Sequence, residues 1–421
     1  MGLADERTRP ISFDAPLGRR IIDLHVWAVR QGLLGTAAEE LLAGFCRRLT
    51  DAGVPLWRGS AAMRTLHPQW GGYVYSWRRE QDAIELQQFG RTDGPAWLRS
   101  PFAYLLRQAN TGTGAQEPGL HLRRHLTGPD AQLDFPVLEK FAAEGGSDYF
   151  AEIVRFGAED DLSHGTGIAY SFATDRPTGF HDDDLALLKA ALPALSLAMM
   201  SYAGHTIASS LLAAYLGDDA GRHVHSGAIE RGSAESLGAV LWYADVRGFT
   251  GIADVTAGGP VVELLNDVFE TLTASLRRRG GQVLKFMGDG MLATFPLGEE
   301  GGERVCHEAL NAAAEAQRAL DRLNSARAAV GKPVGDVDLA LHIGEVLYGN
   351  VGAVDRLDFT VIGPAVNEVA RIETFCEPLG HRILVSAELA AAVGDSHRLE
   401  PLGCHRLRGV SEPRAIYALE F

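Results

Sequence analysis

The stretch Val283-Leu-Lys-Phe-Met-Gly-Asp-Gly-Met-Leu-Ala-Thr-Phe295 decides the fold of the C-terminal half of the chain. Two apolar, β-rich runs flank the turn Gly288-Asp289-Gly290, and this pattern is a strong signal for a β-hairpin. A hairpin does not itself need a lysine in its first strand or an acid in its turn. Together, Lys285 and Asp289 place one cation and one carboxylate at a fixed separation on a rigid element, which is how a precise site is built.

The segments around this hairpin predict an α+β domain. A buried strand at residues 237–246 ends in Asp245, and a helix follows from Pro260 to a stop signal at Gly280. After the hairpin, a long helix over residues 303–329 leads to a strand of alternating apolar residues. The order strand–helix–strand–strand–helix–strand predicts a ferredoxin-like core. Extra elements follow it: strands near residues 359–362, 383–385 and 415–419, and a helix at residues 364–376.

The N-terminal half predicts a second domain with its own helices and strands. Strand-like runs lie at residues 57–66, 73–78, 83–89, 148–155 and 165–174, and helical periods at residues 38–50 and 137–143. The last strand leads into Thr178-Gly-Phe-His-Asp-Asp-Asp-Leu-Ala-Leu-Leu-Lys189, which resembles the closing helix of GAF domains. The resemblance implies a GAF-like α/β regulatory domain. We therefore expect an N-terminal arm (1–36), a GAF-like domain (37–203), a helical linker (204–233) and a C-terminal α+β domain (234–421).

Composition limits the classes of function. The chain has 421 residues and a net charge of −15, so it has no electrostatic reason to bind nucleic acid or anionic lipid. Its four cysteines show no metal-ligand or redox spacing, and residues 1–20 lack a secretory apolar core, which predicts a cytoplasmic protein. Residues 190–215 carry no charge when His205 is neutral and are long enough to span a bilayer. Pro193 and Gly204 nevertheless favour a buried helix pair at a dimer interface.

Two groups of residues have both a functional and a structural interpretation. His181 and the three aspartates after it would suit a metal ion, but acids at a helix N-terminus also complement the helix dipole, and we favour this second interpretation. A set of aromatic residues either lines a ligand pocket or forms the core of a sheet, and we favour the core. These aromatic residues are Trp57, Tyr73, Tyr75 and Trp77.

Acidic residues of the C-terminal half predict a metal site. In Asp245-Val-Arg-Gly-Phe-Thr250 an acid ends a strand, and the glycine after it lets backbone amides approach phosphate oxygens. If sheet pairing sets the Asp289 turn beside that strand end, two carboxylates share one edge. Such a pair is favourable only with a bound cation, and hard oxygen ligands beside a triphosphate predict Mg²⁺.

A helix and a late loop supply polar groups of another kind. Asn367 and Arg371 lie four residues apart, so they share one face of a helix. The amide offers a neutral hydrogen bond and the guanidinium a planar charged fork, which suits a developing phosphoryl charge. Taken alone, such a couple is more often a surface pair. In Leu407-Arg-Gly-Val-Ser-Glu-Pro413, Arg408 is a further candidate for binding terminal phosphates.

Taken together, these residues resemble the class III nucleotidyl cyclases over residues 236–421. Several motifs occur in the right order and spacing, which makes the resemblance far more specific than any single motif. The matching segments are Asp245–Thr250, Lys285–Gly290, Gly344 with Gly349–Gly352, Phe359–Gly363, Val366–Asn367 with Ala370–Ile372, and Leu407–Val410.

The resemblance implies a role for each candidate residue. Asp245 and Asp289 would bind two metal ions, with the carbonyl of Val246 as a further ligand. Lys285 and Thr360 would select the base, Asn367 and Arg371 would stabilise the transition state, and Phe249, Thr250 and Arg408 would bind substrate. Arg408 falls near the family's triphosphate-binding lysine. Thr360 stands where many members have aspartate, as in the subgroup similar to bicarbonate-responsive cyclases.

The hydrogen-bonding groups of Lys285 and Thr360, the two base-selecting residues, predict ATP as the substrate. Adenine presents an acceptor at N1 and a donor amine at N6, so Lys285 would donate to the first and Thr360 accept from the second. Guanine reverses both positions, and a mismatched buried polar pair costs enough to discriminate strongly.

The resemblance therefore implies an adenylate cyclase that makes 3′,5′-cyclic AMP and pyrophosphate by two-metal intramolecular phosphoryl transfer. It places the site at a homodimer interface, with two Mg²⁺ per site, Mn²⁺ as a substitute and an N-terminal domain that regulates through an unknown small-molecule effector. Two alternatives stay open: a catalytically silent nucleotide-binding signalling module, and a guanylate cyclase.

Overall fold

The structure is a computed structural model that describes residues 16–92, 94–110, 120–156, 167–256, 258–298 and 302–421. The chain divides into two compact units, Met1–Leu211 and Leu212–Phe421. Each unit has its own sheet and its own apolar cores, and each is described by itself below.

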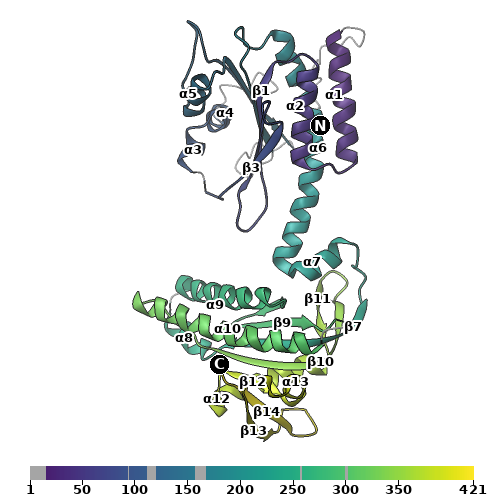
Figure 1. Ribbon diagram of the computed structural model, residues 1–421, viewed down its shortest axis with the longest axis vertical. Helices are drawn as coiled ribbons and strands as arrows, with labels where there is room; N and C mark the ends of the chain where they lie inside the picture. Colours follow the sequence, from purple (N-terminus) through teal and green to yellow (C-terminus); the bar gives the residue numbers. More distant parts are fainter. Residues whose placement is uncertain (1–15, 93, 111–119, 157–166, 257, 299–301) are drawn as a thin grey trace. The chain divides into compact units, whose positions relative to one another are not determined.

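The first unit is built on a six-stranded antiparallel sheet with the order β3-β2-β1-β6-β5-β4 (Figure 1). Its strands are β1 (Leu56–Arg64), β2 (Gly72–Arg78), β3 (Ala83–Phe89), β4 (Leu120–His125), β5 (Asp148–Arg155) and β6 (Gly167–Thr174). The strands expected from the sequence are present, and β4 is an addition from a stretch that the sequence left unassigned.

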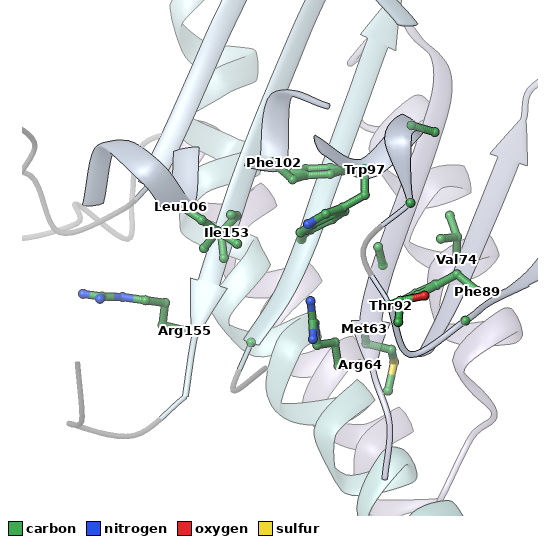
Figure 2. A pocket seen from close by; sticks show the side chains of 16 residues that line it. Met63, Arg64, Val74, Phe89, Thr92, Trp97, Phe102, Leu106, Ile153 and Arg155 are labelled. Carbon is green, nitrogen blue, oxygen red and sulfur yellow. The ribbon is translucent and has the colours of Figure 1, made fainter. Parts of the chain in front are cut away.

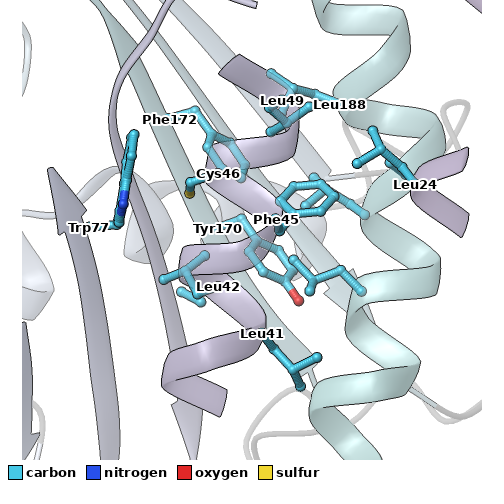
Figure 3. Packing of buried hydrophobic residues seen from close by; sticks show 14 of the residues in the cluster. Leu24, Leu41, Leu42, Phe45, Cys46, Leu49, Trp77, Tyr170, Phe172 and Leu188 are labelled. Atoms are coloured by element: carbon cyan, nitrogen blue, oxygen red, sulfur yellow. The ribbon is translucent and has the colours of Figure 1, made fainter. Parts of the chain in front are cut away.

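Three helices cover one face of this sheet: α1 (Pro16–Leu33), α2 (Ala38–Asp51) and α6 (Asp182–Leu216). Figure 3 shows the core between them, where Leu41, Leu42 and Phe45 of α2 lie against Tyr170 and Phe172 of β6. Ile21, Leu24 and Ala28 of α1 are also buried. Half of the span expected as an N-terminal arm, Pro16–Leu33, is thus a helix of the first unit, because its apolar residues repeat at helical spacing and face the core.

The opposite face carries α3 (Pro95–Leu98), α4 (Pro101–Asn110) and α5 (Pro136–Ala143). Successive side chains of a strand point to opposite faces, so Ala61 joins the core under α2, whereas Ala62 packs with the second core. Trp57, Tyr75 and Trp77 are buried within these cores. The prediction that the aromatic residues form sheet core is therefore confirmed for these three.

Helix α6 begins with the three aspartates noted in the sequence. The Asp184 carboxylate accepts a hydrogen bond from the backbone amide of His181 at 2.8 Å and pairs with Arg176, so it caps the start of the helix. Among the described residues, α6 is the one helix long and apolar enough to cross a membrane, and half of its most apolar window is buried. The expected helix pairing at a dimer interface stays a prediction.

The second unit has a sheet in the order β13-β14-β12-β10-β7-β9-β8, with β11 paired to β10. The four strands β10-β7-β9-β8 have the order and connections of the predicted ferredoxin-like core. The strands are β7 (Ala234–Val246), β8 (Gln282–Met287), β9 (Gly290–Pro296), β10 (Val337–Gly352), β11 (Leu357–Ile362), β12 (Ile383–Ser386), β13 (Leu399–His405) and β14 (Arg414–Leu419).

Helices cover both faces of this sheet (Figure 1). One apolar core includes α9 (Gly258–Arg278), α10 (Gly302–Ala329) and α13 (Ala387–Val393), and the other includes α7 (Asp218–His225), α11 (Pro364–Glu373) and α12 (Cys376–Leu379). The short helix α8 (Phe249–Val255) follows β7 directly. Asp245 lies near the end of β7, and Asp289 follows the end of β8.

Candidate active site

The register of two strands brings the two predicted metal-binding acids together. Asp245 is the Cα partner of Gly290 where β7 pairs with β9. Asp289 directly precedes Gly290 in the tight turn between β8 and β9, where Gly288 has a φ of +67°. The condition set by the sequence analysis is therefore met, since the Asp289 turn lies beside the end of β7.

Gly290 leaves room for the Asp245 carboxylate. A Cβ at position 290 would lie 2.9 Å from Asp245 Oδ1 and 3.3 Å from the Tyr243 hydroxyl. Both distances are shorter than nearly all contacts that real Cβ atoms make. The glycine after Asp289 therefore serves the site as well as the turn.

The acids at this edge repel one another. Burial and the carboxylates of Asp289 and Asp338 raise the pKa of Asp245 to about 6. Burial and the same acids, led by Asp245, raise the pKa of Glu373 to about 7. Tyr243 lies in the same field, and burial followed by the charge of Asp245 raises its pKa to about 12. The site thus holds more negative charge than its own side chains neutralise.

Arg247 offsets only part of this charge. Its Nε donates to Asp338 Oδ2 at 3.0 Å, its Nη2 pairs with Asp338 Oδ1, and a further bond reaches the His381 carbonyl at 3.3 Å. Asp338 faces Asp245 across β10 and β7. Because the guanidinium is held by Asp338, a cation that neutralises Asp245 and Asp289 has to come from outside these side chains. The donor set of carboxylate oxygens suits a hard divalent ion such as Mg²⁺.

Sequence reasoning did not find Glu373, Asp338 or Tyr243. Glu373 ends α11 two residues after Arg371, which is roughly half a helical turn, so the two side chains point to different sides of the helix. No local motif marks it, since its relation to Asp245 arises only from the packing of α11 on β7 and β10. Asp338 carried a weak signal as an acid inside an alternating apolar strand.

The predicted base-selecting residues lie on facing strands. Lys285 of β8 forms an ion pair with Asp358 of β11, and both side chains are about two-fifths exposed. Thr360 is two residues further along β11, so its side chain lies on the same face of the strand as Asp358. The structure therefore brings Lys285 to the strand that carries Thr360. The contact with Asp358 is one that the sequence analysis did not predict.

Helix α11 carries Asn367 and Arg371, and Glu368 of the same helix ties it to neighbouring elements. Glu368 accepts a hydrogen bond from Arg414 Nε at 2.7 Å, and His342 Nε2 lies 3.5 Å from its carboxylate. Arg371 lies against the turn of the predicted phosphate-binding loop, with its guanidinium nitrogens 3.5 and 3.6 Å from the place of a Cβ on Gly409. Arg371 and the loop of the exposed Arg408 are thus neighbours.

The remaining predicted residues follow β7. Val246 is buried in the core and pairs with Val337 of β10. Gly248 has a φ of +64°, and helix α8 begins at Phe249 and Thr250 immediately after it. The left-handed glycine turns the chain sharply past the acids, as expected for a loop whose amides approach a ligand.

The C-terminal part of the chain is similar to known proteins. The family model described as the adenylate and guanylate cyclase catalytic domain matches residues 234–420. An adenylate cyclase of Anabaena cylindrica is 33% identical over 162 residues, which is 38% of this chain and 31% of the relative. Adenylate cyclase 1 of Rhizobium meliloti is 28% identical over 177 residues, which is 42% of this chain and 26% of the relative. The crystal structure of the adenylyl cyclase CyaB from P. aeruginosa has 25% identity and a TM-score of 0.42, and it covers 45% of this chain and 96% of that one.

Residues 234–420 are therefore a class III adenylate/guanylate cyclase catalytic domain. The chain spans about a third or less of the length of these two curated relatives. The matched range lies within the second unit, Leu212–Phe421, which holds all the site residues described above.

Proposed function

We propose that this protein is an adenylate cyclase, which converts ATP into 3′,5′-cyclic AMP and pyrophosphate. The strand register that sets the Asp289 turn beside Asp245 carries the proposal. The name of the two curated relatives, adenylate cyclase, supports ATP as the substrate.

The residues that would hold metal are Asp245, Asp289 and the backbone carbonyl of Val246. They fit a pair of Mg²⁺ ions, with Mn²⁺ as a substitute, because carboxylates crowded at one sheet edge leave their charge uncompensated. When bound, the ions would lower the pKa of the ribose 3′-hydroxyl and offset the charge of the triphosphate.

The chain's own residues would position the reacting atoms. The ribose 3′-oxygen attacks the α-phosphorus, the bond from that phosphorus to pyrophosphate breaks, and the 3′-hydroxyl proton leaves to solvent. Arg371 donates to the α-phosphate oxygens as their charge grows, and Asn367 orients the ribose. Arg408 and the backbone amides of Phe249 and Thr250 hold the triphosphate oxygens.

Base selection would rest on Lys285 and Thr360. Lys285 donates to adenine N1, and the Thr360 hydroxyl accepts from the N6 amine. The Asp358 carboxylate that pairs with Lys285 limits the directions in which the lysine can point. Guanine would place a donor against that ammonium, so ATP is preferred over GTP.

The active site would be shared between two copies of the chain. Within one chain the candidate residues form three groups. The acids Asp245 and Asp289 are the first group, the base-selecting residues of β8 and β11 are the second, and Asn367 with Arg371 on α11 are the third. We propose a homodimer in which the acids of one copy meet the other groups of its partner. Mixing inactive Asp245→Ala chains with inactive Arg371→Ala chains then restores activity through one intact composite site, and a mixture without activity contradicts this arrangement.

The first unit would act as a GAF-like regulatory domain.

The second unit would respond to bicarbonate, because Thr360 matches the subgroup similar to bicarbonate-responsive cyclases. Its test compares cyclase rates in bicarbonate and chloride at matched pH and ionic strength.

The deciding experiment supplies purified full-length protein with ATP or GTP and either Mg²⁺ or Mn²⁺, and identifies the product by mass. Cyclic AMP from wild type and its loss in Asp289→Ala are the expected results. Cyclic GMP as the main product would favour the guanylate cyclase alternative. Nucleotide binding with no cyclic product under either metal would favour the silent signalling module.

A further inference from the structure

The first unit contains a cavity of about 420 Å³ whose described lining is mostly apolar. Figure 2 shows the side chains of Trp97, Phe102 and Ile153 in this lining. Polar groups give a site its specificity, so an apolar lining does not by itself identify a class of ligand. The second unit contains a cluster of the opposite kind, in which nitrogen and oxygen atoms of two histidines and a serine lie around one point.

The three atoms of this cluster form a nearly equilateral triangle. His307 Nδ1 lies 3.4 Å from His397 Nδ1, and Ser396 Oγ lies 3.2 Å from each of these nitrogens. A cation placed over the centre of the triangle would lie about 2 Å from all three atoms, which is the length of a bond from zinc to an imidazole nitrogen. The triangle thus has the size of one face of a tetrahedral zinc site.

The other nitrogen of each ring faces a hydrogen-bond acceptor. Asn311 Oδ1 lies 3.4 Å from His397 Nε2, and Glu303 Oε1 lies 3.7 Å from His307 Nε2. A neutral imidazole carries a single hydrogen, and these acceptors favour its place on Nε2. Both Nδ1 atoms are then left without a hydrogen, and their lone pairs face the centre of the triangle.

The hydroxyl group of the cluster cannot donate to the rings. The single hydrogen of Ser396 Oγ goes to the Val393 carbonyl at 2.7 Å. Lone pairs of three atoms therefore face one another with no hydrogen between them, which is unfavourable unless a cation lies there. A proton on one ring is the weaker solution, because burial and the neighbouring His307 lower the pKa of His397.

The kind of cation follows from the ligand atoms. Imidazole nitrogens suit zinc and related transition metals, whereas Mg²⁺ prefers oxygen. A metal-bound histidine usually donates from its other nitrogen to an oxygen acceptor, and both rings have such an acceptor here. Among the described residues, no group of three or more histidine, cysteine, aspartate or glutamate side chains could hold a metal ion, and this cluster differs because its third ligand is a hydroxyl.

We propose that His307, His397 and Ser396 bind one Zn²⁺ ion, with water as its fourth ligand. The ion would join the first turns of α10 to the segment that follows α13, since the two histidines are 90 residues apart in the chain. It would thereby stabilise the second unit, because an ion that binds only the folded state favours that state. The site uses none of the residues proposed for the cyclase reaction, so either proposal can fail without the other.

The test measures Zn²⁺ binding by titration calorimetry. The full chain is purified without a histidine tag and kept in excess Mg²⁺, which occupies the acidic site. Wild type should bind one Zn²⁺ ion more than His307→Gln or His397→Gln does. Asn311→Ala should weaken this binding about 10-fold to 100-fold, as loss of a group that orients a metal ligand does. His225→Gln is the matched control, because it removes an exposed histidine of the same unit and should bind like wild type.

Thermal unfolding gives a second measurement of the same site. Zn²⁺ at about 100 times its Kd should raise the melting temperature of the second unit by about 5–10 °C in wild type and much less in the two histidine variants. If one histidine variant melts below wild type in a chelator, the other one and Asn311→Ala decide. The proposal is overturned if wild type binds no Zn²⁺ in excess Mg²⁺, or if both histidine variants bind as many Zn²⁺ ions, and as tightly, as His225→Gln.

Discussion

Replacing Asp245 with asparagine should stabilise the metal-free second unit, although it removes a residue that the proposed reaction needs. In the folded protein, burial and the charges of Asp289 and Asp338 raise the pKa of Asp245 from 3.8 to about 6. A shift of about 2 pKa units corresponds to about 3 kcal/mol at most. Asp245 is partly open to solvent, so screening reduces the expected gain to about 1–2 kcal/mol.

The sign of the pH dependence follows from the direction of this shift. Between about pH 4 and pH 6 the folded state holds more protons than the unfolded state, so the stability of wild type falls as pH rises through this window. Above about pH 6 the stability that wild type loses through the ionised Asp245 carboxylate stays constant. The advantage of Asp245→Asn should therefore be absent near pH 4 and complete at pH 7.

The assay is thermal unfolding in the presence of a chelator, followed by titration with Mg²⁺. A gain of 1–2 kcal/mol corresponds to about 2–8 °C in the melting temperature of a unit of this size. Added Mg²⁺ should raise the melting temperature of wild type and have little effect on Asp245→Asn. Asp395→Asn removes an exposed acid of the same unit and serves as the control. If Asp245→Asn melts at or below the temperature of wild type at pH 7, the acids do not repel one another as described.

Three further substitutions test other contacts. Gly290→Ala should lower kcat about 100-fold with unchanged circular dichroism, because the new Cβ would lie 2.9 Å from Asp245 Oδ1 and push the carboxylate out of place. A fully active variant would show that this carboxylate has room to move. Asp358→Asn should lower the preference for ATP over GTP about tenfold by releasing Lys285, while stability changes by less than about 1 kcal/mol; an unchanged ratio of kcat/KM values would exclude this role. Glu373→Gln should weaken Mg²⁺ activation about tenfold, as loss of a group that supports metal ligands does, and an unchanged Mg²⁺ dependence of the rate would remove Glu373 from the site.

The sequence predicted those parts of the site that depend on local pairing. The turn Gly288-Asp289-Gly290 fixes a tight hairpin. The apolar strand that ends in Asp245 can occupy only a few positions in the strand order of a ferredoxin-like sheet. These two facts are enough to bring the acids together. The order of the core strands was predictable for the same reason, because helix and strand periods alternate clearly from residue 237 onward.

Contacts between distant elements were not predictable in this way. Glu373 meets Asp245 only through the packing of α11 on the sheet, and Asp358 meets Lys285 only because β11 folds back along β10. Helix α1 was missed for another reason. Val26 and Val29 are apolar but exposed, so the apolar residues of this segment do not form one clear stripe in the sequence.

The cost of the acidic cluster is itself an argument about function. A fold selected only for stability would not keep Asp245 and Glu373 in a partly buried field that raises the pKa of both. A buried carboxylate is normally paired, and Asp338 has its pair in Arg247. Gly290, the first residue of β9, leaves room for this crowded carboxylate. A cluster of acids whose repulsion the chain does not offset is what a site for an external cation requires.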